Sequence, residues 1–206
     1  KNLAVYSLHP IKNITAAEGG IVTGKDHDFM QRLRLMRFHG IERDAWKRYG
    51  KASDPSYDIT EPGFKYNLTD IQAALGLVQM KKIEEINRKR SEIARRYLEG
   101  LSPLQGIDLP GFPDYEHIHS WHLFVVKITA MKRPAFMEAL AEHNIGYGLH
   151  FPPCHRLGYV RNLIGRIDLS ATDEASGKIL SLPLYPGMDE RQIARVIDAV
   201  AKILKQ

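Results

Sequence analysis

The sequence has little cysteine and no long apolar run. Its single cysteine, Cys154, cannot form a disulfide within the chain. No stretch approaches the roughly 18 consecutive apolar residues that a membrane-spanning helix requires, and the opening residues lack the apolar core of a secretory signal peptide. These features predict no membrane insertion and make the cytoplasm the expected location.

The sequence does have the composition of a packed protein. Its 206 residues are 44% hydrophobic and 26% charged, which is ordinary for a folded chain, and the length suits one large domain or two modest ones. The 29 basic residues exceed the 24 acidic ones, giving a net charge of +5. Much of this excess lies in residues 81–96, where lysine and arginine are interspersed with glutamate. Mixed charge of this kind is typical of a solvated helix face, so we expect no nucleic-acid partner.

Hydrophobic patterning predicts two short strands and two helices in the first hundred residues. The strands are residues 3–7 and 21–23, and a Gly-Gly turn signal lies between them. A helix is expected over 26–40 and a loop over 41–62. The strongest local signal is a capping box of Thr69 and Gln72, followed by an apolar stripe that predicts one long helix as far as Gly100.

Beyond residue 100 the expected elements alternate. The stretch 101–115 is rich in proline and glycine, which predicts a linker and places the domain boundary after residue 100. The patterns that follow predict strands at 121–129 and 145–151 and helices at 134–142 and 189–204. This alternation predicts a small α/β domain over residues 101–206.

One lysine, Lys12, lies in a turn between the first two predicted strands, close to hydroxyl and imidazole groups. A lysine that loses part of its hydration in such a turn can act as a nucleophilic amine. On the residues alone, an exposed surface lysine is the commoner explanation, because turns usually face solvent.

Four sequence blocks occur in an order that is typical of one enzyme family. They are residues 7–20 (SLHPIKNITAAEGG), 63–76 (GFKYNLTDIQAALG), 146–155 (GYGLHFPPCH) and 181–186 (SLPLYP). Together they resemble the DegT/DnrJ/EryC1/StrS sugar aminotransferases. Within that family, residues 12–15 (KNIT), 65–68 (KYNL) and 116–124 (EHIHSWHLF) are most similar to the ArnB-type branch that makes UDP-4-amino-4-deoxy-L-arabinose for lipid A modification and polymyxin resistance.

The resemblance implies an α/β fold, namely the C-terminal part of an aspartate-aminotransferase-like, fold type I enzyme that uses pyridoxal 5′-phosphate (PLP). Residues 1–100 would end the PLP-binding large domain with a long connecting helix, and residues 101–206 would form the small domain. The amino donor would be L-glutamate, which leaves as 2-oxoglutarate, and the acceptor a UDP-linked 4-keto sugar. The resemblance also implies a homodimer.

The same resemblance implies roles for residues of the first block. Lys12 would bind PLP covalently and, once released, would shuttle a proton during transamination. Ser7 would hydrogen-bond the cofactor phosphate, and His9 would face the substrate.

The second and third blocks imply contacts across a dimer interface. The neighbouring subunit's cofactor phosphate would be bound by Lys65 or Asn67; both remain open, because the family's commoner pattern has Asn and Arg at these two positions. His150 would enter the substrate pocket of the other subunit.

A pair of histidines, His117 and His119, would share one side of a strand, as two zinc ligands do. No cysteine lies nearby and only Glu116 is at ligand spacing, so we expect no metal and instead a structural or interface role. Trp121 and Phe124 are expected in the core.

The resemblance covers about the C-terminal half of a family member, which leaves a second hypothesis open. Family enzymes bring the aspartate that pairs with the pyridine nitrogen from their other half, and that carboxylate makes the ring an electron sink. We therefore expect this polypeptide alone to be an incomplete catalyst. The alternative is a cofactor-free module that only binds a sugar nucleotide or dimerises.

Overall fold

The computed structural model describes residues 2–41 and 57–205, which form two compact units, Lys1–Ile83 and Glu84–Gln206. Most of the loop expected at 41–62 therefore lies outside the described residues. The boundary between the two units lies at Ile83. The proline- and glycine-rich stretch 101–115 had predicted a domain boundary after residue 100. The helix before that stretch belongs to the C-terminal unit because its apolar face is buried there.

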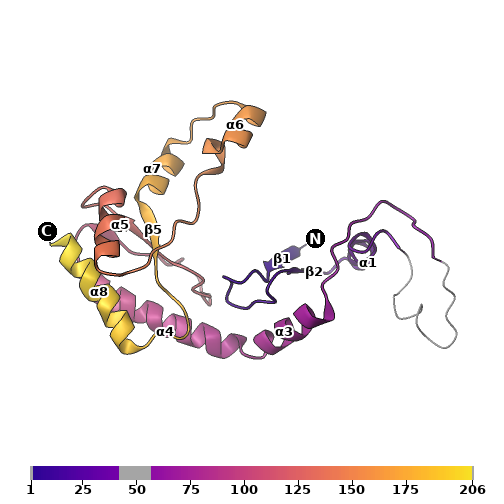
Figure 1. The fold of residues 1–206 in the computed structure, drawn as a ribbon, viewed down its shortest axis with the longest axis horizontal. Coiled ribbons are helices and arrows are strands. Elements are labelled where there is room, and N and C mark those ends of the chain that lie inside the picture. The colour runs from indigo at the N-terminus through magenta and orange to yellow at the C-terminus, as the bar shows by residue number, and fades with distance from the viewer. Residues whose placement is uncertain (1, 42–56, 206) are drawn as a thin grey trace. The chain divides into compact units, whose positions relative to one another are not determined.

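The N-terminal unit begins with an antiparallel pair of strands, β1 (Leu3–Ser7) and β2 (Gly20–Gly24) (Figure 1). Leu3 pairs with Gly24 and Ser7 pairs with Gly20. Because the register closes at Ser7 and Gly20, residues 8–19 form a loop at one end of the pair. Both strands were predicted, and the loop is the segment that holds Lys12.

Helix α1 (His27–Met36) follows β2, with Asp26 as its N-cap. The Asp26 carboxylate accepts from the Phe29 backbone amide at 3.1 Å, which satisfies one of the free N–H groups of the first turn. The helix ends four residues earlier than predicted, because His39 and Gly40 adopt positive φ angles and turn the chain. At Gly40 a Cβ atom would lie 1.8 Å from the Glu61 carbonyl oxygen, so only glycine fits there.

Helix α3 (Asp70–Met80) has the predicted capping box. Gln72 N–H donates to the Thr69 hydroxyl oxygen at 3.3 Å, and the Thr69 N–H donates to the Gln72 side-chain oxygen at 3.2 Å. The prediction of one unbroken helix to Gly100 is wrong, since α3 ends at Met80 and α4 (Ile83–Leu101) begins after two turn residues. Lys82 N–H bonds to the Gln79 carbonyl, three residues back, and this tighter turn interrupts the helix without disturbing the apolar pattern that suggested continuity.

The C-terminal unit is built on a three-stranded antiparallel sheet in the order β3-β4-β5. Its strands are β3 (Ile107–Asp108), β4 (Phe124–Ile128) and β5 (Ile179–Leu182). Strand β4 starts three residues later than predicted, because Trp121 has a φ of 44°, which no strand residue adopts. The strand predicted at 145–151 is absent from the described structure, which has only one isolated bridge there, Gly148 to Ser181; the glycines at 146 and 148 give this segment little tendency to extend.

Three long helices pack on this sheet, namely α4, α5 (Arg133–Glu142) and α8 (Glu190–Leu204). Helices α4 and α8 lie side by side (Figure 1), and a Cβ atom at Gly100 would lie 2.7 Å from Ile197 Cδ1. Helices α5 and α8 were predicted from proline placement and from a regular apolar stripe. The side chains of Tyr97, Phe124 and Phe136 are all fully buried in the shared core.

Two short helices, α6 (Gly158–Ile164) and α7 (Ser170–Lys178), and a 3-10 turn at Cys154–Arg156 were not predicted. Neither α6 nor α7 has a buried residue, so the apolar periodicity that marks a core helix is missing from both. Within the described residues, no helix combines the length and the apolar character needed to cross a membrane.

Candidate active site

Lys12 lies in a tight turn at the end of the β1–β2 pair. Its backbone N–H donates to the His9 carbonyl at 2.9 Å, which closes a turn over residues 9–12. The Lys12 side chain is half-buried, and the two central residues of the turn, Pro10 and Ile11, are exposed. The turn therefore presents a primary amine at the rim of the loop.

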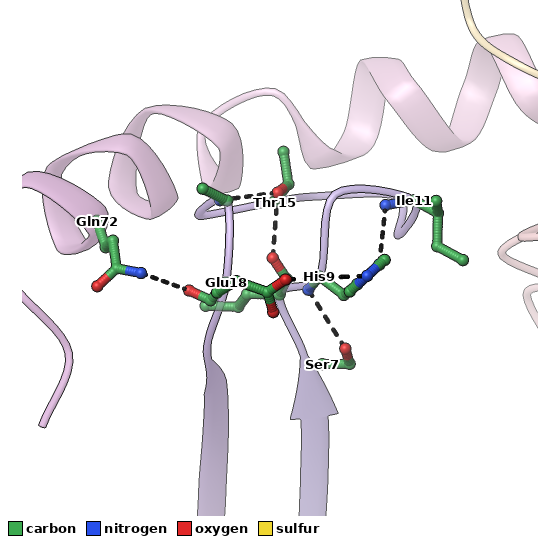
Figure 2. Close-up of polar contacts among 8 residues, drawn as sticks. Ser7, His9, Ile11, Thr15, Glu18 and Gln72 are labelled. Atoms are coloured by element: carbon green, nitrogen blue, oxygen red, sulfur yellow. Dashed lines mark hydrogen bonds and ion pairs between the residues drawn. The ribbon is translucent and has the colours of Figure 1, made fainter. Parts of the chain in front are cut away.

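The loop that carries this turn is anchored by its two buried residues, Leu8 and Ala16. Ala16 N–H donates to the Leu8 carbonyl at 3.0 Å, and the Thr15 hydroxyl donates to the same carbonyl at 3.1 Å (Figure 2). Leu8 N–H in turn donates to the Gly19 carbonyl at 2.9 Å. These bonds tie both ends of the loop together and leave Lys12 at its open side.

Helix α3 contacts the loop through two residues of the second block, Gln72 and Gly76. The Gln72 side-chain N–H donates to the Glu18 carbonyl at 3.2 Å, as Figure 2 shows. At Gly76, the only buried residue of α3, a Cβ atom would lie 3.6 Å from the Ala16 Cβ. The first and second sequence blocks are thus in direct contact.

Ser7 is the last residue of β1, and His9 lies in the loop that holds Lys12. The Ser7 hydroxyl oxygen accepts from the His9 backbone amide at 3.3 Å and its own proton remains a donor, so the exposed side chain can still bind an anion. The His9 Nδ1 accepts from the Ile11 amide at 3.3 Å, and its Nε2 lies 3.9 Å from Glu18 Oε1. Ser7, His9 and Lys12 thus lie at the same end of the β1–β2 pair, and their roles around a cofactor stay a prediction.

Lys65 and Asn67 lie on a separate segment that runs back along the end of α1. Tyr66 N–H donates to the Arg37 carbonyl at 2.8 Å, and residue 65 forms a bridge with Phe38. The Lys65 ammonium lies 4.3 Å from the centre of the Phe38 ring, a cation–π contact that holds it over this ring. Lys65 is exposed and Asn67 half-buried; the contact of either with a phosphate stays a prediction.

His150 belongs to the C-terminal unit, and its Nδ1 lies 2.9 Å from the Ser181 hydroxyl oxygen. Its ring also contacts Phe151, with ring centres 5.2 Å apart. The side chain is half-buried. Its predicted place in a partner's substrate pocket is not tested by one chain.

The two histidines weighed as metal ligands lie in an irregular segment, where their ring centres are 6.5 Å apart. Across residues 2–41 and 57–205, no three His, Cys, Asp or Glu side chains are grouped closely enough to bind a metal ion. The His119 Nδ1 instead accepts from the Trp121 amide at 2.9 Å. Trp121 and Phe124 are buried, which confirms their expected place in the core.

Sequence reasoning missed one buried charge in this unit. Arg90, which the mixed charge pattern placed on a solvated face, is only 6% exposed. One of its guanidinium nitrogens donates to the carbonyls of Trp121, His122 and Leu184, at 3.0, 3.2 and 3.1 Å, and burial lowers its pKa. The helical spacing could have predicted this burial. Arg90 lies three residues before Ile93 and seven before Tyr97, which puts it on the apolar side of α4.

Comparison with known proteins agrees with this arrangement of blocks. The model of the DegT/DnrJ/EryC1/StrS aminotransferase family matches residues 1–201. The chain belongs to this aminotransferase family, as the four blocks predicted.

Solved structures with the same fold show how much of such a protein the chain represents. The sugar aminotransferase CalS13 from Micromonospora echinospora is 27% identical with a TM-score of 0.84, and the alignment covers 98% of this chain and 52% of CalS13. DesV from S. venezuelae is 29% identical with a TM-score of 0.83, and the shares are 99% and 52%. Spr1654 from Streptococcus pneumoniae, in its PLP form, is 25% identical with a TM-score of 0.84, and the shares are 98% and 52%.

The chain thus spans about half the length of the structures it matches. Its mixed α/β architecture is that of part of a fold type I enzyme, which confirms the predicted fold class. The family and the PLP form of Spr1654 also identify pyridoxal phosphate as the cofactor of this class of enzyme, as predicted.

Proposed function

We propose that this chain carries the lysine-bearing part of the active site of a PLP-dependent nucleotide-sugar aminotransferase, with Lys12 as the residue that binds the cofactor. The single observation that carries the proposal is the anchored loop: it has a half-buried lysine at its open side and the His9 imidazole, and the Ser7 hydroxyl ends the strand before it. Family membership over residues 1–201 supports it.

The donor set of this loop fits the cofactor. A primary amine suits an aldehyde, and an exposed hydroxyl whose proton is free suits a phosphate oxygen. Ser7 ends β1 and Lys12 follows it by five residues, so the same end of the strand pair would supply a group for each end of PLP. When bound, PLP supplies an electron sink for the bond that breaks next to the transferred nitrogen.

The roles we propose for the protein groups are those that the family resemblance implies. The Lys12 amine would hold the cofactor through its aldehyde and, once released by the amino donor, would move a proton at the carbon next to the transferred nitrogen. The His9 ring is held by its bond to the Ile11 amide, and it would face the substrate. Asn67 or Lys65 would contact the phosphate, and His150 the substrate, in an assembled homodimer.

For the substrates we infer L-glutamate as donor and a UDP-linked 4-keto sugar as acceptor, with UDP-4-amino-4-deoxy-L-arabinose as the product. The similarity of residues 116–124 and of the first two blocks to the ArnB-type branch supports this choice. An excess of basic over acidic residues suits a diphosphate ligand. The product would then serve lipid A modification and polymyxin resistance.

Covalent trapping tests the assignment of Lys12. The purified chain is mixed with PLP, treated with borohydride and digested, and the modified lysine is located by mass spectrometry. We expect the label on Lys12 and its loss in Lys12→Ala, with Lys25→Ala, a lysine just after β2, as the matched control. Equal labelling of many lysines, or an unchanged label in Lys12→Ala, would overturn the assignment.

A catalytically incomplete module is the second candidate, and the length of the relatives favours it for the isolated chain. We expect no turnover of a UDP-linked 4-keto sugar by the 206-residue polypeptide alone. Turnover at the rate of intact relatives would refute this expectation. Binding of a UDP-sugar without any trapped PLP would favour the module over the enzyme.

A further inference from the structure

His150 is held by a second residue of the C-terminal unit, Ser181 of β5. The Ser181 hydroxyl oxygen lies 2.9 Å from His150 Nδ1, and the serine is only 4% exposed. The two segments are also joined by their backbones. Gly148 N–H donates to the Ser181 carbonyl at 3.0 Å and Ser181 N–H donates to the Gly148 carbonyl at 2.8 Å.

The imidazole ring is further confined by the residue beneath it. A Cβ atom at Gly148 would lie 2.3 Å from His150 Cε1 and 3.1 Å from both ring nitrogens. No real Cβ contact is that short, so the ring occupies space that only glycine leaves. The space left by Gly148 therefore fixes the plane of the imidazole ring. The hydrogen bond to Ser181 fixes the side-chain rotation that points Nδ1 toward β5.

The direction of this hydrogen bond follows from the burial of the serine. Within the described part of the chain, His150 Nδ1 is the only hydrogen-bond partner of the Ser181 hydroxyl. A buried hydroxyl proton without an acceptor is costly, whereas an oxygen with an unused lone pair costs less. The hydroxyl therefore donates to Nδ1, and the neutral ring carries its proton on Nε2.

We infer that Ser181 is a positioning residue that presents His150 as an Nε2–H donor. The His150 Nε2 atom makes no hydrogen bond to the described residues, so it is the ring atom left for a ligand. An N–H donor recognises an oxygen acceptor, such as a phosphate or hydroxyl oxygen of a sugar nucleotide. The inference rests on the proposed substrate role of His150, but the tautomer itself is a property of this chain.

Nuclear magnetic resonance of the 15N-labelled 206-residue chain measures the tautomer directly through correlations between ring nitrogens and carbon-bound protons. The spectra are recorded at about pH 8, above the ordinary histidine pKa of about 6.5, and His150→Gln assigns the signals. We expect a protonated-type Nε2 and an unprotonated-type Nδ1 in His150. In Ser181→Ala the separation of the two nitrogen shifts should be lost, and in Ser181→Thr, which keeps the hydroxyl, it should be retained.

His143 serves as an internal control in every spectrum. Its Nδ1 lies 2.8 Å from the Ala139 carbonyl oxygen, and because a carbonyl only accepts, His143 must carry the opposite tautomer. Gly148→Ala gives a second route to the same result, since it displaces the ring while the Ser181 hydroxyl is kept. A protonated Nδ1 in His150 of the unmodified chain, or an unchanged pattern in both Ser181→Ala and Gly148→Ala, would overturn the inference. None of these outcomes depends on PLP trapping at Lys12, so each proposal can fail without the other.

Discussion

The two units of the chain bury their apolar side chains to very different extents. The C-terminal unit has a continuous core of helices α4, α5 and α8 on the β3-β4-β5 sheet. In the described N-terminal unit the buried hydrophobic residues are Leu8, Ala16 and Ile41. Large apolar side chains there remain exposed, including Val5 at 77% and Ile71 at 84%.

This difference indicates what holds each unit together. In the C-terminal unit, burial of apolar surface dominates, as it does in an independently folding domain. In the N-terminal unit the described structure depends on local devices, such as helix caps, and on backbone bonds between loops. We infer that the N-terminal unit reaches full stability only when further protein covers its apolar faces, which agrees with relatives about twice as long.

The largest expected effect is the loss of a core aromatic from the C-terminal unit. Phe136 is fully buried on α5, so Phe136→Ala should lower the free energy of unfolding by about 3–5 kcal/mol. Denaturant unfolding followed by the fluorescence of Trp121, with Trp46 replaced by phenylalanine, measures this. Phe29→Ala is the matched control from the other unit, where the side chain is 42% exposed. If Phe29→Ala shifted the Trp121 unfolding transition as much as Phe136→Ala does, the two units would not unfold independently.

A smaller loss is expected from the buried cation of α4. Arg90→Met removes the donor of three backbone carbonyls and should lower the free energy of unfolding by about 3 kcal/mol, because those acceptors are left buried. Arg88→Met is the matched control two residues away, since Arg88 forms only an exposed pair with Glu92, and its cost should stay below about 0.5 kcal/mol. The same unfolding assay compares them. Equal effects would mean that the Arg90 contacts add nothing to stability.

These cases also show what could be predicted from sequence. Helix caps such as Asp26 and Thr69 act within three residues, so local pattern was enough. The bond from Gln72 to the Glu18 carbonyl joins residues 54 apart, and no local signal carries that information. The same holds for Ser181, which meets His150 only because Gly148 pairs with β5. The residues of the candidate site could therefore be proposed from the sequence, but the long-range hydrogen bonds that hold them in place could not.

The tertiary fold also overrode two predictions made from periodicity. The apolar residues between 71 and 97 keep a helical spacing on both sides of the turn at Lys81 and Lys82. Lys81 itself has nearly helical backbone angles. Periodicity therefore could not locate the break. In the C-terminal unit the positive φ of Trp121 delays the start of β4, although a tryptophan followed by Phe124 and valines favours a strand.

Alkaline pH should weaken the C-terminal unit through Tyr97. Its hydroxyl donates to the Pro183 carbonyl at 2.7 Å, and burial, with a smaller contribution from Tyr185, raises the pKa of Tyr97 well above its usual value. Above about pH 10 the unfolded chain releases this proton while the folded chain retains it, so stability falls as pH rises. Below that pH the contribution is constant.

Tyr97→Phe separates the stability that comes from the hydrogen bond to Pro183 from the stability that is lost when the hydroxyl titrates. At neutral pH it should cost about 1–2 kcal/mol, because the Pro183 carbonyl loses its donor. Above about pH 10 its stability should fall less steeply than that of the unmodified chain. Denaturant midpoints measured between pH 7 and the alkaline limit test both, and parallel pH profiles would contradict the assignment to Tyr97.

The smallest effect gives the sharpest comparison, because the described part of each unit has one helix with a capping box. Asp189 caps α8 with Gln192, and Thr69 caps α3 with Gln72. Replacing an N-cap by alanine costs about 1 kcal/mol. Helix α8 buries five residues, whereas α3 buries only Gly76, so Asp189→Ala should lower the cooperative unfolding free energy by about this amount.

Thr69→Ala should leave the Trp121 transition unchanged and instead speed amide hydrogen exchange in the first turn of α3, where Gln72 N–H loses its acceptor. Exchange measured by mass spectrometry after short labelling times, with the two capping variants side by side, distinguishes the responses. If Thr69→Ala lowered the Trp121 transition as much as Asp189→Ala, the two units would unfold as one, and the helix caps of the N-terminal unit would be coupled to the core of the C-terminal unit. If only local exchange changes, the lysine-bearing loop rests on a helix whose stability is set locally, so its rigidity depends on whatever covers α3 in the assembled protein.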